Sequence, residues 1–124
     1  MDEEINWRII DYAKLGNVRF KKHALVRSIE RGIKIAGIAE VLQKCQIIAE
    51  YPEDQPLKSY LVLGFTKIKR PLHVVVALDE KEKYIWVISV YEPDSRNWDK
   101  TFVKRLEKWS VHSAKLSWKK AKPY

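Results

Sequence analysis

The sequence predicts an α+β domain in which a helical hairpin packs on a small, curved, antiparallel β-meander. Apolar residues recur at helical spacing as far as Cys45, and strand-like patterns follow between residues 46 and 91. The connections between those strand patterns are short, which favours antiparallel neighbours. With 124 residues, of which 46% are hydrophobic, the chain is long and apolar enough for one packed domain.

Helices and a short strand are expected in the first 45 residues. Residues 3–14 begin with acidic side chains, which suit a helix N-terminus, and carry apolar residues near helical spacing. Residues 18–21 alternate and predict a short edge strand. The hairpin begins with a helix over residues 22–30, and Gly32 follows where a helix-ending glycine is typical. The second hairpin helix has a buried stripe of Ile35, Ile38, Leu42 and Cys45.

Four strands are expected after the hairpin, over residues 46–51, 58–66, 72–79 and 84–91. Pro52 closes the first of them, and Pro71 delays the start of the third. The last two strands are apolar on both faces, whereas a sheet with one face in water should alternate more clearly. These strands are therefore either central and covered on both faces, or one face takes a partner.

Helical spacing returns after Pro93, which predicts a helix that covers the sheet. Its apolar stripe consists of Trp98, Phe102, Leu106 and Trp109. We place the domain at residues 1–98 and treat residues 99–124 as a basic, Trp-containing helical extension or tail, in the same domain or appended to it.

The net charge of +8 is concentrated late in the sequence. Residues 1–95 hold 15 basic and 14 acidic side chains, whereas residues 96–124 hold 9 and 2. A nearly neutral body with a basic tail favours a polyanionic partner: nucleic acid, an acidic protein or an anionic surface. The alternative is a tail that only makes the protein more soluble.

Composition and spacing argue against several classes of protein. The longest apolar runs, such as Val74–Leu78, are far too short to span a bilayer, and the acidic start does not resemble a signal peptide. We therefore expect a cytoplasmic protein with no membrane contact. The single cysteine, Cys45, excludes internal disulfides and lies on the inward helix stripe. Widely separated histidines and only four glycines form no metal motif and no phosphate loop, so no metal and no cofactor are expected.

The helix over residues 22–30 carries a candidate phosphate-binding ridge. His23, Arg27 and Arg31 are spaced by four residues and stack along one helix face. A histidine with two arginines has the groups needed to bind a phosphodiester and move a proton. The alternative is a solvated helix face that Glu30 partly neutralises.

The strands carry the second set of candidates. His73 is either a buried structural histidine or a general acid or base near a basic turn. Tyr91 can stack on a base or supply a phenol, and Glu92 can act as a general base; alternatively, both simply end a strand before Pro93. Other basic residues either contact phosphates or belong to a solvated face: Arg70, Arg96, Lys100, Lys104 and Arg105.

Several short motifs resemble a bacterial and archaeal family of domains of unknown function. The resemblance runs over about residues 18–98, with the motifs in the right order and spacing. They are His23-Ala24-x-x-Arg27-x-x-x-Arg31-Gly32-Ile33, Ile47-Ile48-x-x-Tyr51-Pro52, Ser59-Tyr60-Leu61-Val62-Leu63-Gly64-Phe65, Arg70-Pro71-Leu72-His73-Val74-Val75 and Tyr91-x-Pro93-Asp94. The family is similar to the RelE/ParE-like toxins, which implies two helices on a curved antiparallel sheet.

The resemblance implies a metal-independent endoribonuclease that cleaves mRNA, free or on the ribosome, as the toxin of a type II toxin–antitoxin pair. A small zinc-finger protein would be its antitoxin. Cleavage at the 2′-oxygen needs a base, an acid and cations for the phosphate charge. The candidates for these roles are, in that order, His73 or Glu92, Tyr91 or His23, and Arg27 or Arg31.

Two features depart from RelE-like nucleases. The expected strands offer Tyr91, His73 and Arg70 but no matching lysine pair, and residues 99–124 lie beyond the resemblance. The alternative function is a non-catalytic module that binds nucleic acid or protein. In that alternative the apolar sheet and the Trp-rich tail form a homodimer or partner interface, and the basic tail docks on RNA or on an acidic protein.

Overall fold

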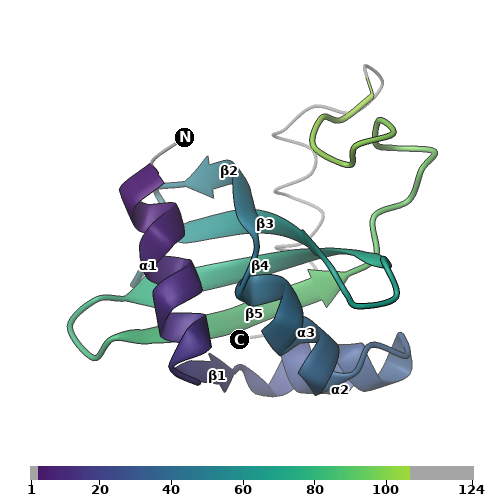
Figure 1. Ribbon diagram of the computed structural model, residues 1–124. Coiled ribbons are helices and arrows are strands. Elements are labelled where there is room, and N and C mark those ends of the chain that lie inside the picture. Colours follow the sequence, from purple (N-terminus) through teal and green to yellow (C-terminus); the bar gives the residue numbers. More distant parts are fainter. Residues whose placement is uncertain (1–2, 107–124) are drawn as a thin grey trace.

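A computed structural model describes residues 3–106, which form three helices and one five-stranded sheet (Figure 1). The α+β class is confirmed. The elements are α1 (Glu3–Lys14), β1 (Val18–Phe20), α2 (Lys22–Glu30), α3 (Ile35–Leu42), β2 (Gln46–Tyr51), β3 (Ser59–Phe65), β4 (Pro71–Asp79) and β5 (Tyr84–Tyr91). Each helix and strand expected before Pro93 is present, with bounds that differ by a few residues at most.

The sheet has the strand order β1-β5-β4-β3-β2. Strands β2 to β5 form the expected antiparallel meander, and the expected edge strand β1 pairs with β5 in parallel, so the whole sheet is mixed. The short parallel strand satisfies part of the outer edge of β5: the Ile85 amide donates to the Asn17 carbonyl at 3.0 Å, and the Lys21 amide donates to the Val87 carbonyl at 3.0 Å. A covered edge cannot template pairing with another chain.

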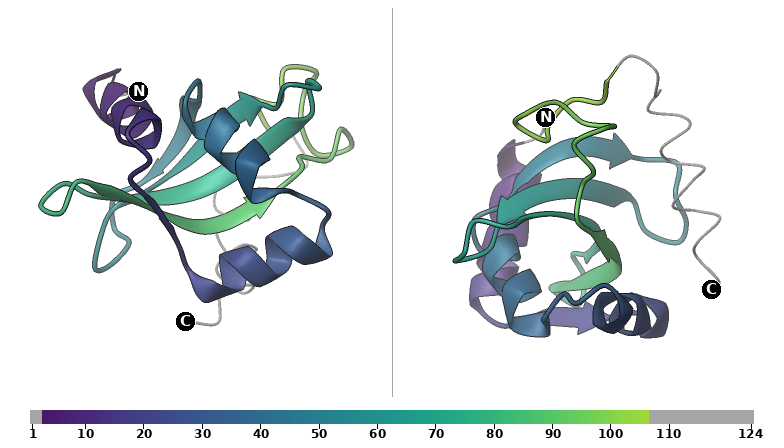
Figure 2. Two further views of the ribbon diagram at one scale, coloured as in Figure 1. Left: turned by 60° about the horizontal axis from the view of Figure 1, so that its bottom comes forward. Right: turned by 90° about the vertical axis from the view of Figure 1, so that its right-hand side faces the viewer.

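The two predicted hairpin helices do not form a hairpin packed as one unit. Helix α2 lies against β5, and α3 lies against β3 and β4, so each helix has its own place on the sheet (Figure 2). Between them Gly32 has φ +66°, and the Ile33 amide donates to the Ser28 carbonyl at 2.8 Å. This glycine therefore ends α2 as predicted, because only a left-handed residue lets the chain leave the helix in this way.

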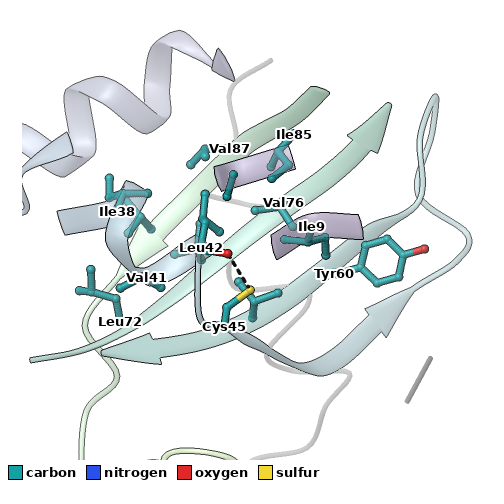
Figure 3. Packing of buried hydrophobic residues seen from close by; sticks show 14 of the residues in the cluster. Ile9, Ile38, Val41, Leu42, Cys45, Tyr60, Leu72, Val76, Ile85 and Val87 are labelled. Carbon is teal, nitrogen blue, oxygen red and sulfur yellow. Dashed lines mark hydrogen bonds between the residues drawn. The ribbon is translucent and has the colours of Figure 1, made fainter. Parts of the chain in front are cut away.

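The main core lies between the helices and one face of the sheet (Figure 3). Ile9 of α1, Ile38 of α3, and Val76 of the central strand β4 are fully buried there. Cys45 is also buried, donates to the Leu42 carbonyl at 3.5 Å, and has its pKa raised to about 12 by burial. A thiol with such a pKa is not a nucleophile at neutral pH.

The opposite face of the sheet, called here the second face, carries a smaller apolar cluster. It includes Leu61, Val75 and Ile88 from three neighbouring strands. Residues 94–106 cover one end of it, and Trp98, 7% exposed, packs there with Phe102. The strands are apolar on both faces because at this end the helices cover one face and residues 94–106 cover the other. Trp98 thus packs on the sheet of its own chain.

The helix expected after Pro93 is absent from residues 94–106, which form turns and an isolated bridge between Trp98 and Arg105. Aspartates organise these turns: the Asp94 carboxylate accepts the Arg96 amide at 2.8 Å, and the Asp99 carboxylate accepts backbone amides four and five residues on. Such side-chain bonds compete with helix formation. Trp109 and the rest of the predicted extension lie outside the described residues.

Candidate nucleic-acid interface

The structure joins His73 and Tyr91, which face each other across β4 and β5. Both ring nitrogens of His73 are hydrogen-bonded: Nε2 lies 2.8 Å from the Phe102 carbonyl oxygen, and Nδ1 lies 3.1 Å from the Tyr91 hydroxyl. Because a carbonyl only accepts, Nε2 carries the proton and Nδ1 accepts from the phenol. Arg105 in turn donates to the Tyr91 hydroxyl. These contacts form one hydrogen-bond network that runs from Arg105 through Tyr91 and His73 to the Phe102 carbonyl.

The histidine in this network is sealed from solvent, whereas Tyr91 and Arg105 are half-buried. The Trp98 ring stands edge-on to His73, with ring centroids 4.3 Å apart, and the Arg105 guanidinium lies 4.2 Å from the Trp98 centroid. His73 is 0% exposed, and burial lowers its pKa to about 4. Burial likewise raises the pKa of Tyr91 above its ordinary value. His73 is therefore neutral at pH 7, and with residues 94–106 in place no substrate reaches it.

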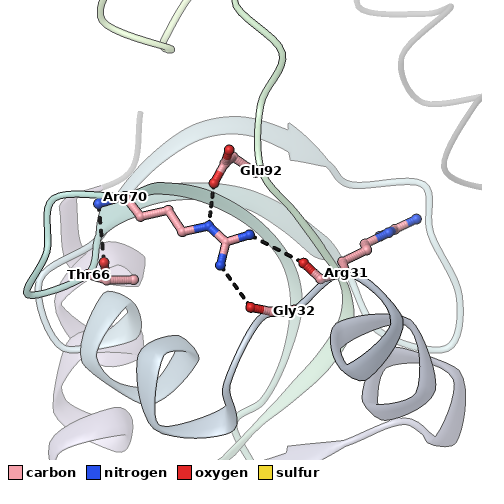
Figure 4. Close-up of polar contacts among 5 residues, drawn as sticks. All are labelled: Arg31, Gly32, Thr66, Arg70 and Glu92. Atoms are coloured by element: carbon pink, nitrogen blue, oxygen red, sulfur yellow. Dashed lines mark hydrogen bonds and ion pairs between the residues drawn. The ribbon is translucent and has the colours of Figure 1, made fainter.

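Arg70, Glu92 and Arg31 hold the turn after α2 against the sheet (Figure 4). The Arg70 guanidinium pairs with the Glu92 carboxylate and donates to the carbonyls of Gly32 at 2.9 Å and Arg31 at 3.3 Å. Arg31 donates to the Val90 carbonyl at 2.5 Å, on the edge of β5 that β1 does not reach. The geometry gives these candidates a clear structural role.

The other predicted site residues lie apart from His73. His23 is half-buried on α2, and Arg27 on the same helix is exposed beside Glu30 at 4.0 Å. Neither forms a hydrogen bond or ion pair with His73 or Tyr91 within residues 3–106. Arg96 is 84% exposed and pairs with its neighbour Asp94. Lys100 and Lys104 are exposed on the turns.

A basic and aromatic strip lies on the second face, at the edge formed by β1 and β5. It consists of Arg19, Lys21, Tyr84 and Trp86. The Arg19 guanidinium carbon lies 3.7 Å from the Tyr84 ring centroid, and Lys21 Nζ lies 4.4 Å from the Trp86 centroid. Arg19 is exposed, and the other three are half-buried. Cations for phosphates and rings for bases thus occur together.

A pocket of about 350 Å³ adjoins this strip on the second face. Lys21 and Trp86 form one side of it, and the loop between β2 and β3 forms the other. Leu57, Ala77 and Ile88 contribute apolar surface, while the polar lining comes from Asp54, Gln55, Ser59 and Asp79. A volume of this size lies within the range of small-molecule sites.

Sequence reasoning missed the strip, although part of the signal was present. The alternation of residues 18–21 places Arg19 and Lys21 on the same side of an extended chain, and Tyr84 and Trp86 share a side in the same way. Only the parallel pairing of β1 with β5, which sets Arg19 opposite Trp86, brings the two pairs together. Nothing local in the sequence predicts that pairing.

Fold and surface together define a small α+β domain with a basic and aromatic strip and a pocket on its sheet. Residues 20–92 match the family described as Domain of unknown function (DUF4258), and because this covers more than half of the chain, the chain belongs to that family. The match lies inside residues 18–98, where the resemblance to a family of unknown function was found. No curated protein and no solved structure matches the chain.

Two further observations concern residues 3–106 only. No helix in this part of the chain is long and apolar enough to cross a membrane. Nor does it contain a group of three or more His, Cys, Asp or Glu side chains that could hold a metal ion.

Proposed function

We propose that the protein is an RNA-binding module that holds a single strand along the strip of Arg19, Lys21, Tyr84 and Trp86. The observation that carries this proposal is the seating of two cations over two aromatic rings on one sheet face. Proteins that bind single strands combine a positive surface that follows the backbone with rings on which bases stack. The net charge of +8 adds long-range attraction for a polyanion.

The arrangement of the strip supports this proposal in a second way. Arg19 and Lys21 are two residues apart in an extended chain, so their side chains follow the sheet edge in a row. Their partners Tyr84 and Trp86 repeat the same spacing on β5. A strand of RNA lying along this edge would meet phosphate-binding groups and stacking surfaces side by side.

The direct test is binding of a labelled oligouridine of about 12 nucleotides, followed by fluorescence anisotropy at low salt. The double variant Arg19→Ala/Lys21→Ala should weaken binding about tenfold or more, because two phosphate contacts are lost. The control is Lys14→Ala/Lys44→Ala, which removes the same charge from exposed lysines at the ends of α1 and α3. Equal losses in both variants, or no binding by the unchanged protein, would refute the strip as the RNA site.

A second candidate function is a metal-independent endoribonuclease of the RelE/ParE-like toxin class. One specific observation favours it: the chain from Arg105 through Tyr91 to His73 lies on the same sheet face as the strip, and it contains a cation, a phenol and an imidazole. Cleavage of RNA at the 2′-oxygen needs such groups. For catalysis residues 94–106 would have to leave His73, because they now cover it.

This second candidate has its own test. Labelled RNA is incubated with the protein in chelator, with and without ribosomes, and products ending in a 2′,3′-cyclic phosphate are sought. Tyr91→Phe should abolish cleavage, whereas His23→Gln, which removes a histidine outside this network of contacts, should not. Intact RNA under both conditions would leave binding as the activity of this protein.

Membership of this toxin class would also imply a protein partner, the antitoxin. A type II toxin is held in check by an antitoxin, here expected to be a zinc-finger protein encoded beside this chain. Co-expression with such a neighbour should give a complex that co-purifies and that relieves any growth arrest caused by the chain alone.

A further inference from the structure

The pocket beside Trp86 differs in charge from the strip that it adjoins. Asp54 and Asp79 both line it, and among residues 3–106 Lys21 is its only cationic lining residue. Two carboxylates repel a phosphate, so the pocket is unsuited to the RNA backbone. They are good acceptors for N–H groups, because an ionised carboxylate offers lone pairs and no proton. The pocket therefore favours a group that donates hydrogen bonds and carries no negative charge.

The remaining lining fits a flat aromatic ligand. The Trp86 indole lies at one side, and Leu57, Ala77 and Ile88 provide apolar surface between the walls. A nucleobase stacks well on an indole, and such stacking contributes favourably to the binding free energy of a single strand. The ammonium of Lys21, 4.4 Å from the indole centroid, is then close enough to serve the phosphate of the same nucleotide.

Asp79 is the carboxylate best placed to read the edge of a base. It ends β4 on the second face, and its Oδ1 accepts the Glu82 amide at 3.0 Å within the β4–β5 turn. That bond fixes the carboxylate, and Oδ2 makes no hydrogen bond within residues 3–106. Asp54, by contrast, is 7% exposed and accepts from the Ser59 hydroxyl, so it belongs to the wall.

We propose that this pocket is a subsite for a guanine base of the bound RNA, with Asp79 as acceptor and Trp86 as stacking surface. Guanine is the base whose Watson–Crick edge places two donors, N1–H and N2–H, side by side. Adenine and cytosine present a ring-nitrogen acceptor there, and uracil presents its one donor between two carbonyls, so each would set a lone pair against the carboxylate. This inference rests on the proposed RNA binding and adds base preference to it.

The experiment compares two labelled oligonucleotides of about 12 nucleotides, one all-uridine and one with a single central guanosine. The unchanged protein should bind the guanosine-containing strand roughly tenfold more tightly. Asp79→Asn should erase that difference while leaving the binding of the all-uridine strand intact. Asparagine keeps an oxygen for the Glu82 amide, so the turn and the melting temperature should be preserved.

The matched control is Glu82→Gln, which removes one negative charge from the same turn but lies outside the pocket lining. It should keep the guanosine preference. Equal affinity of the unchanged protein for both strands, or a preference that survives Asp79→Asn, would overturn the guanine subsite and leave the RNA-binding strip in place. Failure to bind either strand would overturn the proposed function and the subsite together.

Discussion

His73 illustrates how strongly surroundings decide the role of a single residue. Its place in an apolar strand is compatible with a catalytic or a structural histidine, and the sequence leaves both open. In the folded protein both ring nitrogens are bonded and Trp98 covers the ring. A buried imidazole that donates to a carbonyl and accepts from a phenol holds residues 94–106 on the sheet.

This environment makes stability depend on pH. Burial lowers the pKa of His73 to about 4 in the folded protein, whereas the unfolded value is near 6.5. Between these pH values His73 is protonated in the unfolded chain but not in the folded protein, so the free energy of unfolding falls as pH drops from about 6.5 to 4. The contribution at stake is about 3 kcal/mol. Denaturant titrations at several pH values measure it.

The control for this prediction is a pair of histidine variants. His73→Gln should remove that part of the pH dependence, whatever its effect on stability at neutral pH. His23→Gln, on the half-buried side of α2, should keep it. A His73→Gln protein whose stability still falls as steeply as that of the unchanged protein would show that other groups cause the decline.

Arg70 is the second residue whose role the structure assigns. It joins one carboxylate and two helix-end carbonyls, so Arg70→Ala should lower the free energy of unfolding by about 1–2 kcal/mol. Arg96→Ala removes an arginine that, within residues 3–106, pairs only with Asp94 and is 84% exposed, and should cost under about 0.5 kcal/mol. Urea denaturation compares the two variants, and similar losses would contradict the proposed role of Arg70.

At the scale of elements, α3 packs closely on β3 at Gly64. A Cβ atom added at Gly64 would lie 2.6 Å from the Val41 Cγ1 and 2.9 Å from the Val41 carbonyl oxygen. The backbone oxygen cannot move without shifting the helix. Glycine is therefore required at position 64 because α3 and β3 lie too close for a side chain, and not because of an unusual backbone φ angle.

Two glycine variants test this close approach. Gly64→Ala should lower the free energy of unfolding by about 1–3 kcal/mol, because the added methyl overpacks the contact with Val41. Gly37→Ala, in α3 itself, meets only the Thr66 methyl at 3.5 Å and should raise stability by about 0.5–1 kcal/mol through helix propensity. Thermal and urea denaturation report both. A neutral Gly64→Ala would mean that α3 moves away at little cost.

On the scale of the whole molecule, the two faces of the sheet differ in what covers them. Three helices occupy the first face, while the second is covered by residues 94–106 at one end and bears the strip and the pocket at the other. The net charge of +8 is a property of the full chain. At the sheet edge formed by β1 and β5, two basic side chains, Arg19 and Lys21, lie against aromatic rings.

Salt dependence is the prediction that belongs to this scale. For single strands the logarithm of the binding constant falls with the logarithm of salt concentration by about 0.7 per phosphate contact. Arg19→Ala/Lys21→Ala should therefore reduce the slope by about 1.4, and Lys14→Ala/Lys44→Ala should leave it unchanged. Anisotropy titrations of oligouridine at several salt concentrations measure the slope. An unchanged slope in the first variant would place the phosphate contacts elsewhere.

The sequence alone determined the local structure from residue 3 to Tyr91, because each element there carries its own period, cap or turn residues. Gly32 and Pro52 are examples: both act on the backbone within one or two residues. The same reasoning failed after Pro93, where the helical spacing of Trp98 and Phe102 proved to reflect packing on His73 rather than a helix.

Only the tertiary structure decided which distant residues share a surface. The parallel pairing of β1 with β5 created the basic and aromatic strip, and the fold of residues 94–106 sealed His73. The reason is that such pairings are selected by burial and hydrogen bonding summed over the whole molecule, and no short stretch of sequence contains that sum.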